Sequence, residues 1–595
     1  MKQTLSDSYD RALLNKRKSF LVLDKNITYA YTIKRIQKLS RLFQELGIKS
    51  GDAISVLSDN DEEVSFIFLA SLLNGITFSV LDHDIKEERF KAIVKSYRPV
   101  KIFIDAEKAK ALHLSLSEYP MLYIEKKFTK IFTLFAKKDK DNSGYFGLLH
   151  KAKPVSPTFD VASKHKTALV LFTSGTTSRP KGVELSFSNI FSHLDTLQKV
   201  YKYSQEMQIL NLMPLSHADG LLQGTLLSFY TNTTLHRPFK FKIQNMDILA
   251  NLLKKRKITH FFAPPMVLSL MNKYIKNKES IFAYREFHTV VSVAAQLEGT
   301  LYLDFVNNFK TNIINVYGLT ETVAGSLFTR YDDFLQAGTI GVPVDCSAKI
   351  IDLQGKEVCG DGSGELLLKG EHIMNGYFND PLATSLVLNE GWFSTGDIAS
   401  RKDEVYSIVG RKKNVVIYGG YTIYPEEITE VLNSHEAVLE SAAFGEENEI
   451  WGESIISAVV LAEGKRSSEN ELKLYCQSRL EAYKIPRTIV ILESLPRGQS
   501  GKVRMKELQQ SIASKNNEDS TLFMKIQEVA SECFMVSLDE VQRESSSQSI
   551  ESWDSIGHLD FITSLENAFA LKFKTVEILR IDTIQDVIDI LESKT

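Results

Sequence analysis

The chain has 595 residues, of which 43% are hydrophobic and 24% charged, with a formal net charge of −3. This length exceeds what one hydrophobic core supports, so we expect about three domains of ordinary globular composition. Four widely spaced cysteines, with no CxxC pair among them, argue against a disulfide framework and a zinc site and indicate a reducing compartment.

The N-terminus and the longest uncharged stretch predict a cytoplasmic protein without a membrane span. The first eleven residues, MKQTLSDSYDR, lack the apolar segment of a secretory signal. Val64–Leu81 carries no charge, but its Ser, Asn, Gly and Thr residues favour a buried helix, turn and strand over a lipid-facing span. No concentrated basic patch with interleaved aromatics is present, so we do not expect nucleic-acid binding.

Short β-branched segments alternate with longer amphipathic ones from Lys2 to about Ser400. Helices are predicted over Asn189–Tyr203 and Met246–Lys257. Strands are predicted at Ala53–Ser58, Lys101–Asp105, Ala168–Thr173, His260–Ala263 and Ile313–Val316. This alternation predicts an α/β architecture with mainly parallel sheets. The lysine-rich stretch 126–166 interrupts the pattern, and we interpret it as a surface excursion, with partner docking as an alternative.

A phosphate-binding loop is predicted within Leu171–Ser186, LFTSGTTSRPKGVELS. Its hydroxyl residues surround Gly175 and are Thr173, Ser174, Thr176 and Thr177. Together with Lys181 they offer the backbone N–H groups, short donors and single cation that grip a polyphosphate. The frame is not a Walker A loop, which requires glycine in place of Pro180 and Ser or Thr in place of Gly182. The alternative is a solvated Ser/Thr turn between two strands.

A second, smaller unit follows the charged residues Gly410–Asn414. It is predicted to contain helices Tyr424–Leu432 and Asn470–Arg479 and strands around Ser441–Phe444 and Ser457–Leu461. Gln510–Ser520 is polar and unpatterned, as is typical of a linker. Beyond it, Thr521–Glu592 is predicted to form three or four short helices. The domain boundaries are therefore set at 1–409 and 410–512 for the large and small parts, 513–520 for the linker and 521–595 for the helical domain.

Charge is distributed unevenly between these parts. Thr521–Ser593 contains fourteen Asp and Glu residues against five Lys and Arg, a local balance of −9, so the remainder carries about +6. We expect the acidic domain to dock on the basic body of the chain or on basic partners.

Six motifs occur along the chain in a fixed order. They are TSGTTSRPKGV, YGLTET (Tyr317–Thr322), GELLLKG (Gly364–Gly370), GWFSTGDIA (Gly391–Ala399), GRKKN and PRGQSGKV (Pro496–Val503). Together they resemble the adenylate-forming superfamily of acyl- and aryl-CoA synthetases, nonribosomal peptide adenylation domains and beetle luciferase. The resemblance implies a large N-terminal adenylation domain, a small mobile α+β domain, and an AMP-producing acid–thiol ligase that uses ATP and Mg²⁺.

The reaction of this superfamily explains the phosphate-side residues. A carboxylate attacks the α-phosphate of ATP, which brings anions together, so the site must supply cations and preorganised donors. By resemblance, Thr173–Thr177 and Lys181 hold the β- and γ-phosphates, and Thr320 bonds the α-phosphate. Glu321 is the implied ligand of Mg²⁺, a hard cation that prefers oxygen ligands.

The resemblance also assigns the nucleoside and the moving parts. Asp397 accepts both ribose hydroxyls with support from Arg411, and Tyr317 stacks near the adenine. Lys502, in the glycine-rich turn GQSGK, bridges the acid's carboxylate and the α-phosphate during adenylation. Lys413 falls at the hinge on which the small domain rotates. The alternatives for the two lysines are a solvated surface charge and an exposed turn.

His217 lies where related acyl- and aryl-CoA synthetases have a histidine that gates or lines the acyl pocket. Adenylation domains for α-amino acids have an aspartate there, and a histidine supplies no fixed negative charge, so we expect a carboxylic acid other than an α-amino acid. Asp219 could take that position if the alignment shifts, and a buried core histidine is the plainer alternative. Ser178, Val293 and Ala294 depart from the family pattern, and the last two indicate a short or slim acyl group.

The tail carries its own signature, ESWDSIGHLDFITSLENAFALKF (Glu551–Phe573). Apolar residues recur at helical spacing from Ile556 to Phe569, and Ser555 stands just before that helix, where its dipole favours an anion. This resembles the all-α acyl and peptidyl carrier domains, whose serine bears 4′-phosphopantetheine. A plain N-cap formed by Asp554 and Ser555 is the alternative.

Together these features predict an adenylation–carrier didomain that loads the thiol on its own Ser555. Its implied partners are a phosphopantetheinyl transferase and a downstream acyl-accepting enzyme. Two alternatives stay open, a synthetase that uses free CoA with the tail as an interaction module, and a non-catalytic scaffold.

Overall fold

The structure is a computed structural model of the full chain. It describes all residues except 1, 125–143, 161–162, 174–179, 242, 331–336, 353, 419–420, 449–451, 499–501, 551 and 595. At some further positions, 514–521 and 555–556 among them, it describes the backbone alone. The chain divides into two units, the first formed by Met1–Ile491 with Arg497–Lys502 and the second by Leu492–Pro496 with Val503–Thr595.

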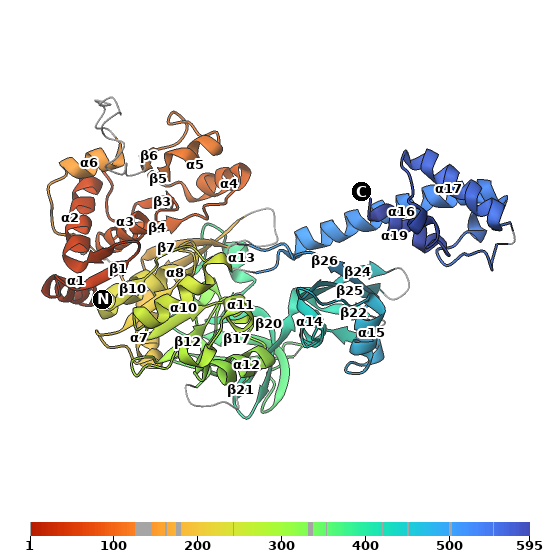
Figure 1. Cartoon of the computed structure of the whole chain (residues 1–595). Helices are drawn as coiled ribbons and strands as arrows, with labels where there is room; N and C mark the ends of the chain where they lie inside the picture. The colour runs from red at the N-terminus through yellow and green to blue at the C-terminus, as the bar shows by residue number, and fades with distance from the viewer. Residues whose placement is uncertain are drawn as a thin grey trace. The chain divides into compact units, whose positions relative to one another are not determined.

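One sheet of the first unit carries the strands around the predicted phosphate loop (Figure 1). Its order is β18-β8-β7-β4-β3-β5-β6, with parallel pairing from β7 to β6 and antiparallel pairing of β7 with β8 and of β8 with β18. Its strands are β3 (Ala53–Leu57), β4 (Thr77–Val80), β5 (Lys101–Asp105), β6 (Met121–Ile124), β7 (Thr167–Thr173), β8 (Lys181–Ser186) and β18 (Gly376–Tyr377). The short strand β18 therefore closes the edge of the sheet next to the phosphate loop.

A second sheet has the order β15-β14-β13-β12-β11-β9-β10-β1-β2. The strands from β13 to β1 in this order pair in parallel. Antiparallel strands form both edges, β14 and β15 at one edge and β2 at the other. Its strands are β1 (Ser19–Val22), β2 (Asn26–Thr28), β9 (Gln208–Asn211), β10 (Thr234–His236), β11 (His260–Ala263), β12 (Thr289–Ser292), β13 (Ile313–Tyr317), β14 (Leu327–Phe328) and β15 (Val342–Pro343). The five predicted strands are confirmed within one residue at each end.

Helices pack on these two sheets and bury a large apolar core. They are α1 (Lys2–Leu14), α2 (Tyr29–Glu45), α3 (Asp61–Leu73), α4 (Glu87–Tyr97), α5 (Ala106–Ala111), α6 (Tyr145–Lys151), α7 (Phe187–Tyr201), α8 (Ala218–Gly220), α9 (Leu227–Thr231), α10 (Met246–Lys255), α11 (Pro265–Tyr274), α12 (Gly299–Phe309) and α13 (Pro381–Ser385). The uncharged stretch Val64–Leu81 forms most of α3 and all of β4, as predicted. Among the described residues, no helix has the length and apolar character to cross a bilayer.

The predicted surface excursion over 126–166 is wrong for the part of it that forms α6. Tyr145 is fully buried and donates its hydroxyl hydrogen to Oε2 of Glu63 at 2.6 Å, while Arg35 donates to Oε1 at 2.6 Å. The apolar pair Tyr145 and Leu149 repeats at helical spacing and buries one face of this helix. Residues 125–143 lie outside the described residues.

Two antiparallel sheets follow, so the expectation of mainly parallel sheets holds only for the centres of the first two. The third sheet contains β16 (Ser347–Ile351), β17 (Gly362–Lys369), β19 (Leu388–Asn389), β20 (Trp392–Lys402) and β21 (Val405–Arg411). The fourth contains β22 (Val416–Tyr418), β23 (Tyr421–Ile423), β24 (Val438–Asn448), β25 (Gly452–Leu461) and β26 (Thr488–Leu492), packed with α14 (Pro425–Asn433) and α15 (Glu469–Gln477). In the third sheet, β19 with β20 and β20 with β21 are joined by short turns, which allow antiparallel pairing without a crossover helix.

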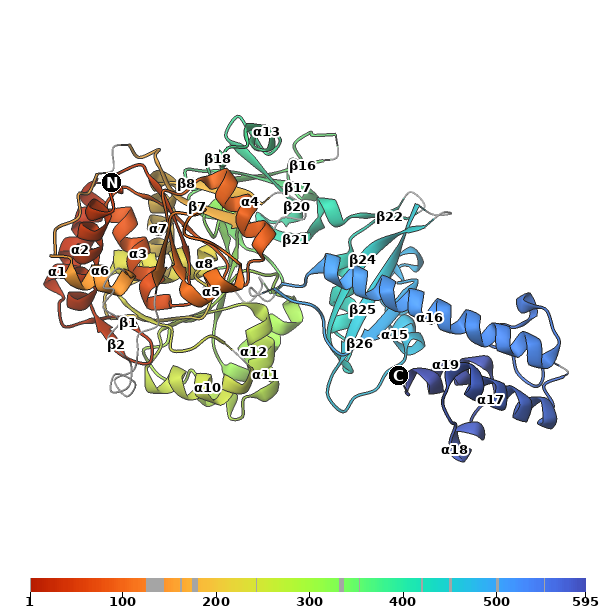
Figure 2. The ribbon, with the colours of Figure 1, turned by 90° about the horizontal axis from the view of Figure 1, so that it is seen from above.

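The second unit is helical and has a core of its own (Figure 2). Its helices are α16 (Met505–Phe534), α17 (Ser555–Phe569), α18 (Thr575–Ile578) and α19 (Ile584–Glu592). Phe534 stacks on Trp553 with ring centroids 4.8 Å apart, and Phe561 lies 4.9 Å from Phe534. The predicted linker 513–520 is part of the continuous helix α16. Its sequence contains neither glycine nor proline, so nothing local terminates the helix.

Candidate active site

A buried carboxylate, Asp397, marks the predicted nucleoside position. Strand register places it opposite Arg411 in β20 and β21, and Nε of Arg411 lies 2.8 Å from its Oδ1. Tyr317, the last residue of β13, donates its hydroxyl hydrogen to Oδ2 at 2.6 Å. Each carboxylate oxygen keeps a second lone pair, so the group fits the two donors of a ribose diol. The β20–β21 hairpin and the end of β13, which lies 80 positions before Asp397 in sequence, therefore meet at this carboxylate.

Tyr317 is tied to Asp397 more directly than the resemblance implied. Burial raises the pKa of the Tyr317 hydroxyl, and the negative charge of Asp397 raises it further. The phenol therefore stays protonated and acts as a fixed donor to the carboxylate. Its stacking near the adenine stays a prediction.

Glu321, the predicted metal ligand, lies in the short 3-10 turn Thr320–Thr322 that follows β13. Tyr377 of β18 donates its hydroxyl hydrogen to Oε1 of Glu321 at 2.9 Å, and the N–H of Met374 donates to the Glu321 carbonyl at 2.9 Å. Burial raises the pKa of the Tyr377 hydroxyl, with the charge of Glu321 adding to the increase. A carboxylate that accepts one hydrogen bond retains lone pairs for a hard cation, so Glu321 fits a role in Mg²⁺ binding. Thr320 is partly exposed in the same turn.

The predicted phosphate loop connects two paired strands. Thr173 ends β7 and lies opposite Lys181, which begins β8, so the loop is closed by the hairpin register. Nζ of Lys181 lies 4.7 Å from the ring centre of Tyr377, a cation–π contact. Arg89 donates to the Thr173 carbonyl at 2.7 Å. Ser174, Gly175, Thr176 and Thr177, and with them Ser178, lie outside the described residues.

Lys502 and His217 are the residues predicted to contact the carboxylate and the acyl group of the acid. The Lys502 side chain stays in contact with solvent, while desolvation by surrounding protein and the charge of Arg411 lower the pKa of its ammonium. Asp219, Asp397 and Glu321 act in the opposite direction. Desolvation, with the charge of Lys502, lowers the pKa of His217, which favours a neutral imidazole.

Asp219 is held by a buried relay that sequence reasoning did not identify. Tyr201 donates its hydroxyl hydrogen to Oε1 of Gln223 at 2.9 Å, and Nε2 of Gln223 donates to Oδ1 of Asp219 at 2.7 Å. Gln223 is fully buried in the π-helical turn Leu221–Leu226. Burial raises the pKa of Asp219 to about 6, against the lowering effects of Gln223 and Lys502.

The predicted hinge lies between the third and fourth sheets in sequence. Lys413 is exposed in the 3-10 turn Lys412–Asn414, directly after Arg411. Its neighbour Lys412 pairs with Glu365 of β17 at 2.8 Å. The hinge role of Lys413 stays a prediction.

Two protein-family models match the chain, and Glu321, Lys181, His217 and Lys502 lie inside the matched ranges, whereas Asp397, Arg411 and Lys413 lie between them. The model described as AMP-binding enzyme matches residues 10–378, well over half of the chain. The chain belongs to the AMP-binding enzyme family. A second model, the AMP-binding enzyme C-terminal domain, matches residues 427–502, which end at Lys502.

Curated relatives match over nearly their whole length. Indoleacetate–CoA ligase of Aromatoleum aromaticum is 26% identical over 506 residues, covering 84% of this chain and 96% of the relative. Oxalate–CoA ligase of Arabidopsis thaliana is 27% identical over 495 residues, covering 82% and 94%. This member of the AMP-binding family is an AMP-forming acid–thiol ligase, as these relatives are.

Solved structures share the fold. ATP-bound MatB from Rhodopseudomonas palustris has a TM-score of 0.76 at 21% identity, covering 85% of this chain and 98% of that one. The o-succinylbenzoate–CoA synthetase MenE of Bacillus subtilis has a TM-score of 0.72 at 23% identity, covering 84% and 97%. These values support the adenylate-forming α/β fold of the first unit.

A buried histidine pair lies next to the Glu321 region. His372 is 5% exposed, its Nε2 lies 2.7 Å from the Ser326 hydroxyl, and its ring stacks on His193 at a centroid distance of 6.2 Å. Burial lowers the pKa of His372 to about 4.

We expect ATP to be distinguished from 2′,3′-dideoxy-ATP through Asp397. Hydrogen bonds to a charged group contribute about 1.5–3 kcal/mol, so wild type should bind ATP at least about tenfold more tightly than the dideoxy analogue. Asp397→Asn should bring this ratio close to one, as measured by calorimetric titration. Asp403→Asn, in the exposed turn of the same hairpin, is the matched control. An unchanged ratio in Asp397→Asn would contradict the ribose role.

We expect His372 to make the enzyme acid-sensitive. The unfolded histidine binds a proton below about pH 6.5, whereas the folded one does so only near pH 4, so the free energy of unfolding falls as pH decreases through this window. Between pH 7 and pH 5 the loss from this group is about 2 kcal/mol. His372→Gln should lose correspondingly less stability over the same interval, as measured by chemical unfolding at both pH values. Equal losses in the variant and in wild type would show that His372 does not contribute.

Proposed function

We propose that this acid–thiol ligase activates a carboxylic acid with ATP and Mg²⁺ as the acyl-adenylate and transfers the acyl group to a 4′-phosphopantetheine thiol on its own Ser555. The observation that carries the proposal is the second unit, a separate helical core that begins after Lys502, where the family match ends. Its product would be an acyl–protein thioester for a downstream acyl-accepting enzyme.

The first step needs cations where anions meet. A carboxylate oxygen of the acid attacks the α-phosphorus, the bond to the bridging oxygen breaks, and pyrophosphate leaves. Lys181 at the start of β8 and Lys502 are the chain's own cations for this step, and Mg²⁺ would neutralise phosphate charge when bound beside Glu321. Lys502 fits the bridging role because Asp219, Asp397 and Glu321 all act on its charge.

The acid itself is proposed to be other than an α-amino acid. An imidazole is neutral or cationic, so His217 supplies no fixed negative charge to an ammonium group, and burial together with the charge of Lys502 lowers its pKa and favours the neutral form. Val293 and Ala294 stand where the family often has a glycine pair, and their larger side chains would narrow the acyl pocket, which favours a short or slim acyl chain.

The second step needs a tethered thiol. Ser555 is the first residue of α17, a helix of 15 residues, and Asp554 accepts a hydrogen bond from the N–H of Gly557 at 2.8 Å. A phosphodiester at this position would lie at the positive end of the helix dipole, which fits the anionic prosthetic group. When attached by a phosphopantetheinyl transferase, the group supplies the thiol that displaces AMP from the acyl carbon.

Free CoA as the acceptor is the second candidate. It is favoured by the curated relatives, which are CoA ligases and align with 80% or more of this chain. In that case the helical unit would serve as an interaction module.

We expect Lys502→Ala to reduce acid-dependent ATP–pyrophosphate exchange by a factor of about 10²–10³, because one preorganised charge on the transition state is lost. Exchange should be measured against a panel of fatty, hydroxy, aryl and amino acids, which also identifies the substrate class. Lys465→Ala, on an exposed lysine, is the control and should retain the wild-type rate. Full exchange in Lys502→Ala would contradict the assigned role.

We expect incubation with CoA and a phosphopantetheinyl transferase to add one prosthetic group at Ser555, detected by intact-protein and peptide mass spectrometry. The loaded protein should then take up the activated acid as a thioester. Ser555→Ala should abolish both signals without changing pyrophosphate exchange, whereas Ser564→Ala on the same helix should change neither. An unmodified Ser555 together with rapid formation of free acyl-CoA would favour the CoA ligase alternative.

A further inference from the structure

The segment 371–378, here named the strap, runs beside β8. The N–H of Asn375 donates to the Glu184 carbonyl at 2.9 Å, and the N–H of Phe378 donates to the Gly182 carbonyl at 2.7 Å. Between them β18 pairs with β8 in antiparallel register. The strap thus follows the strand that begins at Lys181, next to the phosphate loop.

Two contacts connect the strap to Glu321. The Met374 N–H bonds the backbone carbonyl of Glu321, and the Tyr377 hydroxyl bonds its carboxylate, each at 2.9 Å. Glu321 itself lies in a turn of only three residues. Since one contact fixes the main chain and the other the side chain, the position of the carboxylate follows the position of the strap.

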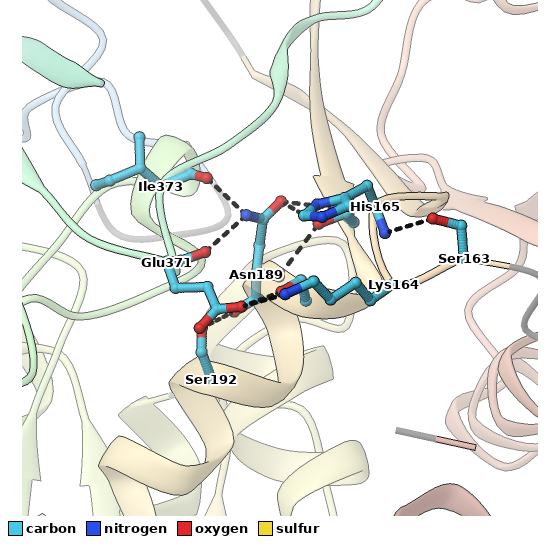
Figure 3. Close-up of polar contacts among 9 residues, drawn as sticks. Ser163, Lys164, His165, Asn189, Ser192, Glu371 and Ile373 are labelled. Atoms are coloured by element: carbon cyan, nitrogen blue, oxygen red, sulfur yellow. Dashed lines mark hydrogen bonds and ion pairs between the residues drawn. The ribbon is translucent and has the colours of Figure 1, made fainter. Parts of the chain in front are cut away.

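Asn189, in the first turn of α7, fixes the start of the strap (Figure 3). Its Nδ2 donates to the carbonyls of Glu371 and Ile373, each at 2.7 Å. Its Oδ1 accepts from the N–H and the hydroxyl of Ser186, at 2.8 and 2.7 Å. The amide therefore uses both donor hydrogens and both acceptor lone pairs.

This set of four bonds selects asparagine. Aspartate has the same shape and would keep the bonds to Ser186, but it has no hydrogens for the two carbonyls and would place a negative charge against them. The helix is anchored independently, because the Ser186 hydroxyl accepts from the Asn189 N–H in a capping box. Only the donor half of the amide reaches the strap.

We propose that Asn189 is a positioning residue for the magnesium ligand. Its amide clamps residues 371 and 373 so that Met374 and Tyr377 hold Glu321 at the phosphate side. This inference rests on the proposed role of Glu321 in binding Mg²⁺, and it assigns a metal-related role to a side chain whose amide bonds Ser186 and the strap.

Titration calorimetry with ATP tests the proposal without any acid. ATP affinity is measured for wild type and Asn189→Asp, once with Mg²⁺ and once with EDTA, and the ratio gives the gain from the metal. Loss of an outer partner of a metal ligand typically lowers metal affinity 10–100-fold, so we expect Asn189→Asp to reduce the Mg²⁺ gain about tenfold. ATP affinity in EDTA should stay at the wild-type value.

Three further variants make the result specific. Ser192→Ala removes a hydroxyl that donates to the Asn189 carbonyl at 3.0 Å and should leave the Mg²⁺ gain intact. Glu321→Gln should reduce the gain, and adding Asn189→Asp to it should cause no further reduction, because both act through one carboxylate. Tyr377→Phe, which removes the other strap contact, should reproduce the effect and keeps the test available if Asn189→Asp does not fold.

An unchanged Mg²⁺ gain in Asn189→Asp and Tyr377→Phe would overturn the proposal, as would an equal loss with Mg²⁺ and with EDTA, which indicates a purely structural role. A missing gain in wild type would instead refute the metal site itself. Failure of the proposed acid activation is separate, because it appears as absent pyrophosphate exchange in an enzyme whose Mg²⁺ gain is normal.

Discussion

The antiparallel pairing of β8 with β18 is the contact on which the phosphate side of this enzyme depends. It joins segments almost two hundred residues apart and places Tyr377 between a cation and an anion. Lys181 lies over the face of the ring, and Glu321 accepts the hydroxyl hydrogen. A hydrogen bond to a carboxylate makes the phenol richer in electrons, which strengthens the attraction of its face for the lysine. The ring therefore separates two opposite charges at a fixed spacing, which fits the phosphate and metal-ion roles proposed for Lys181 and Glu321.

At the proposed nucleoside position, the structure must stabilise a single buried carboxylate, that of Asp397. Asp397 is only 3% exposed, and an unpaired charge at such a position is costly. Arg411 supplies the opposite charge and Tyr317 a neutral donor, one for each oxygen. Because both partners are already in place in the structure, the proposed binding of ribose hydroxyls to Asp397 would need little reorganisation. Lys502 differs, since it belongs to a separate turn and keeps contact with solvent.

The sequence motifs identified most of the groups of the candidate active site, because each motif combines charged or hydroxyl side chains with a glycine-containing segment of the backbone. Hydrophobic periodicity likewise located the central strands, two of them, β5 and β11, at their observed bounds. The roles of Asn189 and Tyr377 were not predictable in this way. Both act through hydrogen bonds to residues more than fifty positions away in sequence. From the neighbouring sequence alone, Asn189 is indistinguishable from an ordinary residue of a helix cap. Asp219 was visible in the sequence, but its raised pKa comes from burial in the folded chain, which the hydrogen bond from Gln223 only partly opposes.

The length and stiffness of helix α16 would limit the proposed transfer of the acyl group to a thiol on Ser555 of the same chain. A continuous helix of 30 residues is about 45 Å long and acts as a stiff spacer, and a stiff tether supports intramolecular transfer only when it spans the required distance. A flexible tether instead gives an effective concentration on the order of millimolar. The residues at 514–520, SKNNEDS, are where the helix is least favourable, since Asn, Asp and Ser each cost roughly 0.5–0.7 kcal/mol relative to alanine. Unwinding this short polar stretch therefore costs little compared with breaking the apolar contacts on either side of it. If the proposed transfer to a thiol on Ser555 requires the helical unit to move, the composition that resembled a linker in the sequence is therefore where α16 would unwind at least cost.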